Sequence, residues 1–295
     1  MKIRPYRLED EAALTSLSAT CARGEGDFVL NPIWEDANEF AAEFGRFGID
    51  PESHVIVGED TGGETIGFAG FLRRPEADLA GLICPIVKHG GRRRGAGGEL
   101  LRAAQELATT KLGIRCATAG IGTRNRAGYS LLASHGFRPV RQHFYMRCDI
   151  APQVQQQKTE GLELDLAQPD DCDAILEIYL ACGFEPRPPE VMRACLLDGR
   201  HILTVARRSG EIVAFSEFET HLPNRTWVAY VGVNDDLRGR GVGSALVAWS
   251  LARQFEAGAV SAMLLLSPAN RTALRAYEKV GFRRSRLIDV LEKNF

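Results

Sequence analysis

One short segment of the chain, "DLRGRGVGSAL" (236–246), combines three glycines with two arginines directly before a helical pattern. Each glycine costs a helix roughly 1 kcal/mol relative to alanine. A helix start without side chains has a use that can outweigh this cost. Its unpaired backbone N–H groups lie at the positive end of the helix dipole, where a diphosphate binds well. Arg238 and Arg240 add positive charge, so the segment is a candidate phosphate-binding loop.

Other interpretations of this segment fit less well. The dinucleotide pattern G-x-G-x-x-G fails because Ser244 stands in the third glycine position, and Leu100 stands there in a similar segment of the first half. The nucleoside triphosphate signature G-x-x-x-x-G-K-[ST] is absent. A disordered RNA-binding segment is not expected between a buried strand and an amphipathic helix. A tight turn of purely structural meaning remains an alternative for one copy taken alone.

The segment occurs twice, together with a second motif. Arg-x-x-Gly-x-Gly stands at Arg92/Gly95/Gly97 and at Arg238/Gly241/Gly243. Downstream, "NRAGYSLLASHGF" (125–137) matches "NRTALRAYEKVGF" (270–282) in the spacing from Asn to Gly-Phe, and the Arg-to-Asn spacing is 33 and 32 residues. The chain is therefore interpreted as a tandem duplication. The Gln-rich stretch 151–160 is the expected linker between domains 1–150 and 161–295.

Each half has the pattern of a mixed α/β domain, with hairpins first and strand–helix–strand units later. The second half is expected to contain strands at 201–208, 212–221, 226–233 and 260–267, and helices after the glycine loop and at 270–280. Ser209-Gly210 is a good hairpin turn. A last strand, "FRRSRLIDVLEK" (282–293), is expected to close the second half, as "FRPVRQHFYMRC" (137–148) closes the first.

Arg238-x-x-Gly241-x-Gly243 after a strand, followed by Asn270 and by Tyr277 before Gly281-Phe282, resembles the GCN5-related N-acetyltransferase (GNAT) superfamily. The resemblance covers nearly the whole chain, once per half, so it is to tandem-domain members, of which the mycothiol synthases are one group. It implies two acyl-CoA N-acyltransferase domains. Each would have a mixed, mostly antiparallel sheet with a splayed central parallel strand pair, flanked by helices.

The resemblance also implies acetyl-CoA as co-substrate, bound where the parallel strands splay, with no metal. Backbone at Val231–Val233 would pair with the pantetheine arm, the loop would hold the diphosphate, and Asn270 would contact the arm from the other side. The donor-binding residues implied in the second half are Val231, Gly232, Val233, Arg238, Gly239, Arg240, Gly241, Val242, Gly243, Ser244 and Asn270. The corresponding residues of the first half are Ile86, Val87, Arg92, Arg93, Arg94, Gly95, Ala96, Gly97, Gly98 and Asn125.

The implied reaction is direct attack of an amine on the thioester in a ternary complex. The leaving thiolate, with a pKa of about 8.5 by analogy with cysteine, benefits from a proton donor. Tyr277 matches the family's position for that general acid, although the tyrosine could also be a half-buried aromatic. The same register in the first half gives Leu132, which cannot donate a proton, and Tyr129 lies one helical turn away. The first half is therefore expected to be catalytically degenerate, and acetyl-CoA binding there is left open.

Two glutamates are candidates for the general base. Glu217 and Glu219 are two residues apart on one strand, so they fall on the same face, where they would accept the amine proton or bind the acceptor. A solvated outer face of a sheet is the alternative. Trp227 stands near the position where many family members keep a glutamate. His221 and Asp235 are further candidates.

Composition excludes several classes of function. A net charge of −2 gives no sign of nucleic acid or an anionic membrane as partner, and no apolar stretch approaches the ~20 residues of a membrane span. Seven scattered cysteines without a metal-like cluster, and no signal peptide, favour a cytoplasmic protein, monomeric or homodimeric. The leading interpretation is an N-acetyltransferase acting on a primary amine of a small molecule. A non-catalytic acyl-CoA-binding or regulatory module, and a protein or peptide acetyltransferase, are the alternatives.

Overall fold

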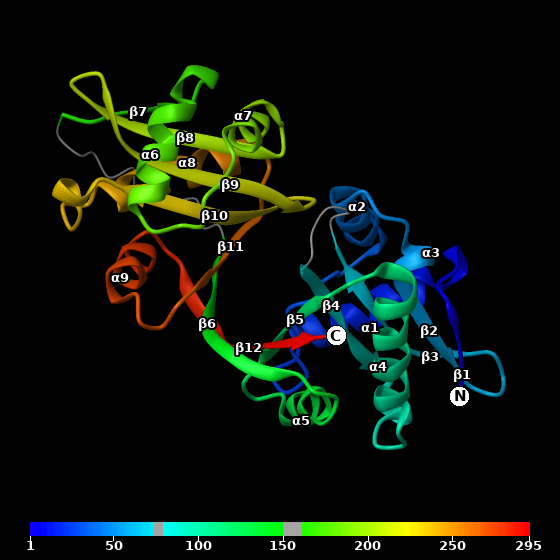
Figure 1. Ribbon diagram of the computed structural model, residues 1–295. Helices are drawn as coiled ribbons and strands as arrows, with labels where there is room; N and C mark the ends of the chain where they lie inside the picture. The colour runs from blue at the N-terminus through cyan, green and yellow to red at the C-terminus, as the bar shows by residue number, and fades with distance from the viewer. Residues whose placement is uncertain (74–78, 150–160) are drawn as a thin grey trace. The chain divides into compact units, whose positions relative to one another are not determined.

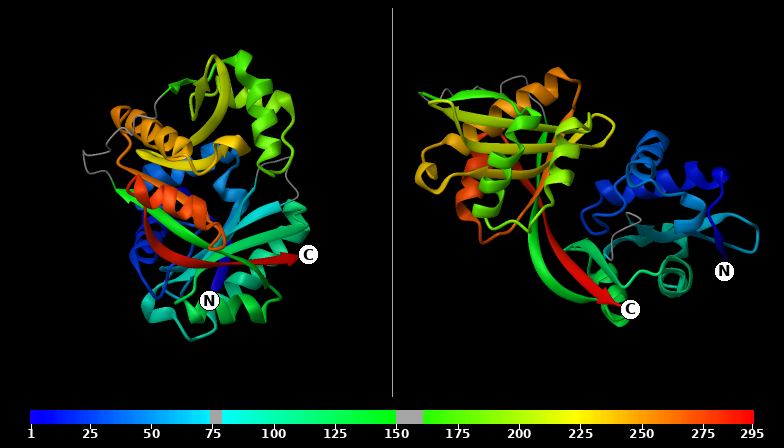
Figure 2. Two further views of the ribbon diagram at one scale, coloured as in Figure 1. Left: turned by 90° about the vertical axis from the view of Figure 1, so that its left-hand side faces the viewer. Right: turned by 45° about the horizontal axis from the view of Figure 1, so that its top comes forward.

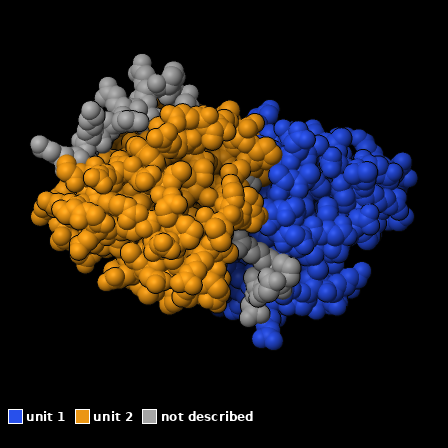
Figure 3. All heavy atoms as spheres, turned by 90° about the horizontal axis from the view of Figure 1, so that it is seen from above, with its two compact units in different colours: residues 1–143, 286–295 blue, residues 144–285 orange. Residues whose placement is uncertain are grey.

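The computed structural model describes residues 1–73, 79–149 and 161–295 and divides into two compact units (Figure 3). Unit 1 consists of Met1–His143 and Arg286–Phe295, and unit 2 consists of Phe144–Ser285. The predicted linker 151–160 lies outside the described residues. Each unit contains strands and helices in alternation, as the sequence predicts for a mixed α/β fold.

Unit 1 is built on a sheet in the order β1-β2-β3-β4-β5-β12. All neighbours are antiparallel except the central pair β4 and β5, which is parallel. Its strands are β1 (Lys2–Pro5), β2 (Val55–Glu59), β3 (Thr65–Leu72), β4 (Leu79–Val87), β5 (Cys116–Gly122) and most of β12 (Arg283–Asn294). Its helices are α1 (Glu11–Arg23), α2 (Ala37–Phe47), α3 (Pro51–His54), α4 (Ala96–Leu107) and α5 (Arg126–Ser134), with short turns η1 (Leu8–Asp10), η2 (His89–Gly91) and η3 (Ala108–Leu112).

Unit 2 repeats this plan in the order β6-β11-β10-β9-β8-β7, with β10 and β11 as the parallel pair. Its strands are β6 (Arg138–Asp149, from Phe144 on), β7 (Glu163–Leu166), β8 (His201–Arg208), β9 (Glu211–Leu222), β10 (Arg225–Val233) and β11 (Ser261–Leu266). Its helices are α6 (Cys172–Ala181), α7 (Pro189–Leu197), α8 (Val242–Glu256) and α9 (Arg271–Lys279), with short turns η4 (Pro169–Asp171) and η5 (Asp235–Leu237). The strands and helices that the sequence predicts in this half are confirmed to within a residue or two at most ends.

Local sequence explains these elements. The β8–β9 hairpin turns at Ser209-Gly210, both with positive φ, as the sequence predicts. Asn270 and Asn125 begin α9 and α5 in the same way, because each side-chain oxygen accepts a hydrogen bond from a backbone N–H three residues on. Alternation along β9 buries Ala214 against α8 and Phe215 against α6. Helices therefore cover both faces of the sheet in unit 2, with α6 and α7 opposite α8 (Figures 1 and 2).

The last strand of each half does not close its own half, and this prediction was wrong. Strand β12, at the end of the second half, pairs antiparallel with β5 of unit 1 from Ile288↔Gly122 to Asn294↔Cys116. Strand β6, at the end of the first half, pairs antiparallel with β11 of unit 2 from Ser261↔Asp149 to Leu266↔Phe144. The compact units thus exchange their closing strands, and their bounds differ from 1–150 and 161–295. An alternating pattern specifies a strand but not the sheet that receives it.

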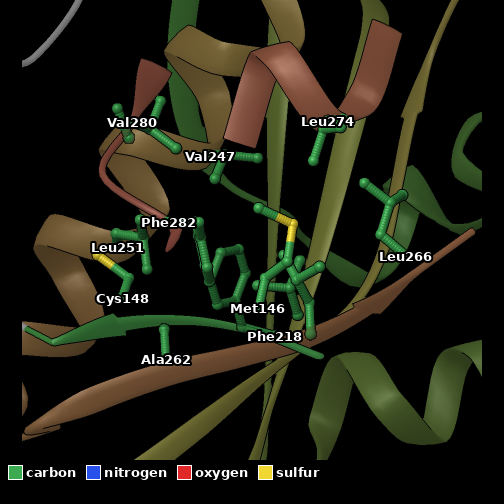
Figure 4. Packing of buried hydrophobic residues seen from close by; sticks show 13 residues of the cluster. Met146, Cys148, Phe218, Val247, Leu251, Ala262, Leu266, Leu274, Val280 and Phe282 are labelled. Carbon is green, nitrogen blue, oxygen red and sulfur yellow. The ribbon is translucent and has the colours of Figure 1, made fainter. Parts of the chain in front are cut away.

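The exchanged strand contributes to the core of unit 2. Met146 and Cys148 of β6 point into the same cluster as Phe218, Leu251 and Phe282 (Figure 4). All five are at most 5% exposed. The first half of the chain therefore supplies two buried side chains to the core of unit 2.

Candidate functional site

The two parallel strands of unit 2 separate after a short common stretch. β10 and β11 pair from Arg225↔Ser261 to Trp227↔Met263, and β10 then continues along β9 alone to Val233. A register shift between Val228 and Tyr230 accompanies the divergence. In the described part of the chain, no residue of β10 beyond Trp227 is paired with β11. The predicted splay is therefore present, and it leaves one edge of β10 facing a cleft.

The glycine loop stands at the mouth of this cleft. Gly239 and Gly241 have φ of 76° and 86°, a left-handed conformation that favours glycine. A Cβ at either position would meet nothing within 4 Å, so the space in front of the loop is open. The first helical hydrogen bond of α8 runs from Ala245 N–H to Gly241 O. The N–H groups of the first turn, from Val242 to Ser244, are left to bind an external acceptor.

A cavity of about 1060 Å³ joins the loop to α9. Backbone and side chains of β10, the whole glycine loop, and one face of α9 form its walls. The predicted residues that line it are Val231, Val233, Arg238, Gly239, Arg240, Gly241, Val242, Gly243, Ser244, Asn270 and Tyr277. Gly232 belongs to the same strand but does not line the cavity, because a Cβ there would meet the Phe215 ring on the opposite face.

The cavity lining is strongly positive. Its charged side chains are Arg238, Arg240, Arg275 and Lys279, and no carboxylate lines it within the described chain. Arg238 braces the loop itself: its Nε donates to Val233 O at 3.0 Å, and its guanidinium pairs with Asp235 at 2.7 Å. The other three cations are exposed. Arg275 and Lys279 were missed from the sequence, although their i, i+4 spacing on one helix face was a usable signal.

Tyr277 lies on α9 and lines the cavity. Its ring packs edge-on against Phe282 with centroids 5.5 Å apart. Burial raises the pKa of the phenol above its usual value of 10, so the hydroxyl keeps its proton at neutral pH. Asn270 accepts a hydrogen bond from Ala273 N–H at 3.0 Å, which caps the start of α9.

Glu217 is placed differently from what a general base needs. Its side chain is 1% exposed and does not line the cavity. Arg187 donates to one carboxylate oxygen at 2.8 Å, and His201 Nδ1 lies 3.0 Å from the other. Burial acts to raise the pKa of Glu217, but His201 and Arg187 outweigh it and leave that pKa lowered. A carboxylate that two cations already neutralise is a poor proton acceptor.

The neighbours of Glu217 form a polar cluster that sequence reasoning missed. The Arg187 guanidinium stacks over the rings of Tyr179 and Tyr230, at 5.2 Å and 4.9 Å from their centroids. Cys195, His201 and Glu217 bring one possible metal ligand each within 4.8 Å of one another. Arg187 disfavours a metal there, since its guanidinium lies 4.0 Å from Cys195 Sγ and pairs with Glu217. Only packing of α6 and α7 on the sheet brings these residues together.

The other candidate bases are Glu219, Asp235 and His221. Glu219 is half-buried and lies opposite Trp227 on β10, on the same face of β9 as Glu217. Asp235 is occupied by its ion pair with Arg238. The side chain of His221 lies outside the described part of the structure.

The predicted loop of unit 1 has the same backbone form. Gly95 precedes α4 with φ of 89°, and Arg92 Nε donates to Val87 O at 2.8 Å, as Arg238 does to Val233. Ile86, Arg93, Arg94, Ala96, Gly97 and Gly98 complete the strand end, loop and helix start. Asn125 begins α5 through Gly128 N–H at 2.9 Å. Leu132, in the register of Tyr277, is buried and apolar.

Comparison with known proteins agrees with this geometry. The model of the Acetyltransferase (GNAT) family matches residues 17–137 and again residues 172–282. A mycothiol acetyltransferase of Streptomyces coelicolor is 26% identical over 305 residues, which cover 95% of this chain and 93% of the relative. A GCN5-related N-acetyltransferase from Sphaerobacter thermophilus has a TM-score of 0.80 at 22% identity, covering 99% of this chain and 95% of that one.

A tandem GNAT protein from the clavulanic acid biosynthesis pathway has a TM-score of 0.70 at 16% identity, covering 99% of this chain and 98% of that one. The two solved structures confirm the predicted fold, and the family match shows that it occurs twice. Across the described residues, no helix is both long and apolar enough to span a bilayer.

Proposed function

Because the chain belongs to the Acetyltransferase (GNAT) family and carries the family's domain twice, we propose that unit 2 transfers the acetyl group of acetyl-CoA to a primary amine of a small molecule. The protein is an acyltransferase, and the family's co-substrate is acetyl-CoA. The observation that carries the proposal is the cavity that runs from the open glycine loop along β10 to Tyr277.

The donor would bind along this cavity by three kinds of contact. The diphosphate accepts hydrogen bonds from the N–H groups of Val242 to Ser244, and Arg240 adds charge. The pantetheine arm follows the unpaired edge of β10 at Val231 and Val233 as an added strand. The cations Arg275 and Lys279 on α9 face the polyanionic end of the donor.

Acetyl transfer then makes one bond and breaks one. The amine nitrogen attacks the thioester carbonyl carbon, the C–N bond forms, and the C–S bond breaks with its electron pair on sulfur. Tyr277 donates its phenolic proton to that sulfur. A phenol is already protonated at neutral pH at its usual pKa of 10, and burial of Tyr277 raises that pKa further. The amine must also shed a proton. Glu219 does not line the cavity, so it would take this proton through a water molecule.

The acceptor class rests on the named relatives and on the charge of the chain. The curated relatives are mycothiol acetyltransferases, which favours a small-molecule amine, and deacetylated mycothiol is the first acceptor to test. A net charge of −2 gives no attraction for basic protein tails. The Arg187 cluster with Tyr179 and Tyr230 lies beside Phe184, which lines the cavity, and these aromatic rings would border the acceptor.

The test is release of free thiol from acetyl-CoA with a panel of amines, by wild type and Tyr277→Phe. We expect kcat to fall about 10²-fold or more in Tyr277→Phe, with the Kd for acetyl-CoA unchanged, since only a proton donor is removed. Tyr129→Phe is the matched control and should have wild-type kcat. Binding of acetyl-CoA without acetylation of any amine would contradict the proposal and favour a non-catalytic module. Acetylation of peptides alone would replace the acceptor class.

A further inference from the structure

The parallel strands of unit 1 separate as those of unit 2 do. β4 and β5 pair from Leu79↔Cys116 to Gly81↔Thr118 and then diverge. The corresponding opening in unit 2 is the proposed donor cleft. What lies in the opening of unit 1 therefore decides whether that unit binds a second donor.

The chain's own segment Phe28–Asn31 occupies this opening. Val29 bridges antiparallel to Ile121 of β5. Two backbone hydrogen bonds attach the segment to β5, from Leu30 N–H to Gly120 O at 2.9 Å and from Gly122 N–H to Phe28 O at 3.1 Å. A third attaches it to β4, from Cys84 N–H to Asn31 O at 2.9 Å. The segment thus bridges both splayed strands by main-chain hydrogen bonds, the mode in which an extended ligand adds to a sheet.

Side chains lock this segment in place. Phe28 and Val29 are 1% and 4% exposed, and Leu30 packs on Gly120, where a Cβ would lie 2.7 Å from Leu30 Cβ. The Arg286 guanidinium covers the Phe28 ring at 4.2 Å from its centroid. The segment is therefore part of the folded core of unit 1.

Asn125 contacts the segment in a way that matters for the comparison of the two units. Its side-chain Nδ2 donates to Phe28 O at 3.4 Å. Asn270, at the same place in unit 2, lines the cavity and is the residue expected to contact the pantetheine arm. In unit 1 a backbone carbonyl of the protein itself takes that contact.

The space between the start of α4 and α5 is also filled in unit 1. A Cβ on Gly97 would lie 3.2 Å from Leu131 Cδ2, so α5 packs directly on the start of α4. In unit 2 the matching position on α9 is Ala276, which lines the cavity, and a Cβ on Gly243 would meet only Val231 and Val233. Leu131 therefore fills a space that Ala276 leaves open.

We propose that unit 1 is a self-occupied acyl-CoA fold, in which Phe28–Asn31 takes the place of the pantetheine arm, so that the chain binds one equivalent of acetyl-CoA, in unit 2. The inference rests on the proposed function for the location of the donor cleft. It assigns the side chain of Asn125 to holding the chain's own segment. The residues of 92–98 are left as a loop without a ligand.

The first test compares matched charge reversals by calorimetric titration of acetyl-CoA. Arg94 and Arg240 occupy the same exposed position in the two loops, so neither variant should disturb folding. We expect one equivalent for wild type, a loss of at least about tenfold in affinity for Arg240→Glu, and no change for Arg94→Glu. Two equivalents, or weakened binding in Arg94→Glu, would overturn the proposal.

The second test does not depend on the donor. Amide hydrogen exchange should show Leu30, Cys84 and Gly122 protected without ligand, and unchanged when acetyl-CoA is added. Fast exchange at these amides, or loss of protection with acetyl-CoA, would show that the segment yields to a ligand and would refute self-occupancy. Absence of all acetyl-CoA binding with these amides protected would instead refute the proposed function of unit 2.

Discussion

The Arg187–Glu217–His201 cluster shows how neighbours decide the role of a single carboxylate. Glu217 sits on the strand face that the alternation predicts, yet its charge is used internally. The side chain of Glu217 is 1% exposed and pairs with both Arg187 and His201, so the three residues form a buried ion-pair network. Removing one member of such a network leaves an unpaired buried charge, which costs more than a surface pair would.

The pH dependence of stability should expose this cluster. Contact with Cys195 and then Glu217 raises the pKa of His201 from 6.5 to about 10. Since the folded protein holds this proton more tightly, its contribution is complete below pH 6.5 and is lost as pH rises toward 10. Over that window we expect wild type to lose about 1.5–3 kcal/mol of unfolding free energy relative to His201→Gln, as for a hydrogen bond between charged groups.

Urea unfolding at a series of pH values across that window measures this difference. His89→Gln, in an exposed turn, is the control and should follow wild type throughout. Parallel curves for wild type and His201→Gln would mean that His201 is not charged in the folded protein. Below the usual pKa of Glu217 the sign reverses, because the lowered pKa of that carboxyl makes its contribution disappear as pH falls.

At the scale of elements, the two units differ mainly in how the second helix of the site packs. α5 and α9 begin with the same asparagine cap and end at the same Gly-Phe pair. The two helices differ at one matching position. Leu131 on α5 packs against the start of α4, whereas Ala276 on α9 lines an open cavity.

Ala276→Leu should therefore close the donor cavity of unit 2. Leucine at this position would fill space that the donor needs, so we expect acetyl-CoA affinity to fall by about tenfold or more. Stability should stay near native, because the matching helix already carries leucine. The reciprocal Leu131→Ala should leave acetyl-CoA binding unchanged. Unaltered affinity in Ala276→Leu, measured by titration, would mean that the donor does not pass between α8 and α9.

At the scale of the whole molecule, the exchange of closing strands ties the two halves of the chain into each other's sheets. β11 is the buried partner of β6, and β5 is the buried partner of β12. Without these partners β5 and β11 would become sheet edges with apolar faces, and such edges aggregate.

Fragments 1–150 and 161–295 should consequently fail to fold singly. Each would lack a closing strand, so we expect poor solubility alone and a soluble one-to-one complex on co-expression. Size-exclusion chromatography and near-ultraviolet circular dichroism measure this. Two fragments that are each monomeric and cooperatively folded would show that the exchanged strands are dispensable.

The sequence alone determined the duplication, the order of strands and helices, the glycine loop before α8 and many of the residues that line the cavity of unit 2, although not Arg275 and Lys279. These follow from short-range properties: side-chain periodicity, the φ values that only glycine adopts easily, and asparagine caps. The family match agrees with the duplication, and the solved structures agree with the fold.

Only the tertiary structure decided which sheet receives β6 and β12, that Glu217 is neutralised by Arg187 and His201, and that Phe28–Asn31 fills the opening in unit 1. Each depends on contacts between residues far apart in the chain. The sequence shows that the stretch between α1 and α2 is longer than the stretch between α6 and α7. It does not show that part of this stretch lies between β4 and β5. Phe28–Asn31 is a short apolar run without alternation, and such a run does not tell where its main chain pairs.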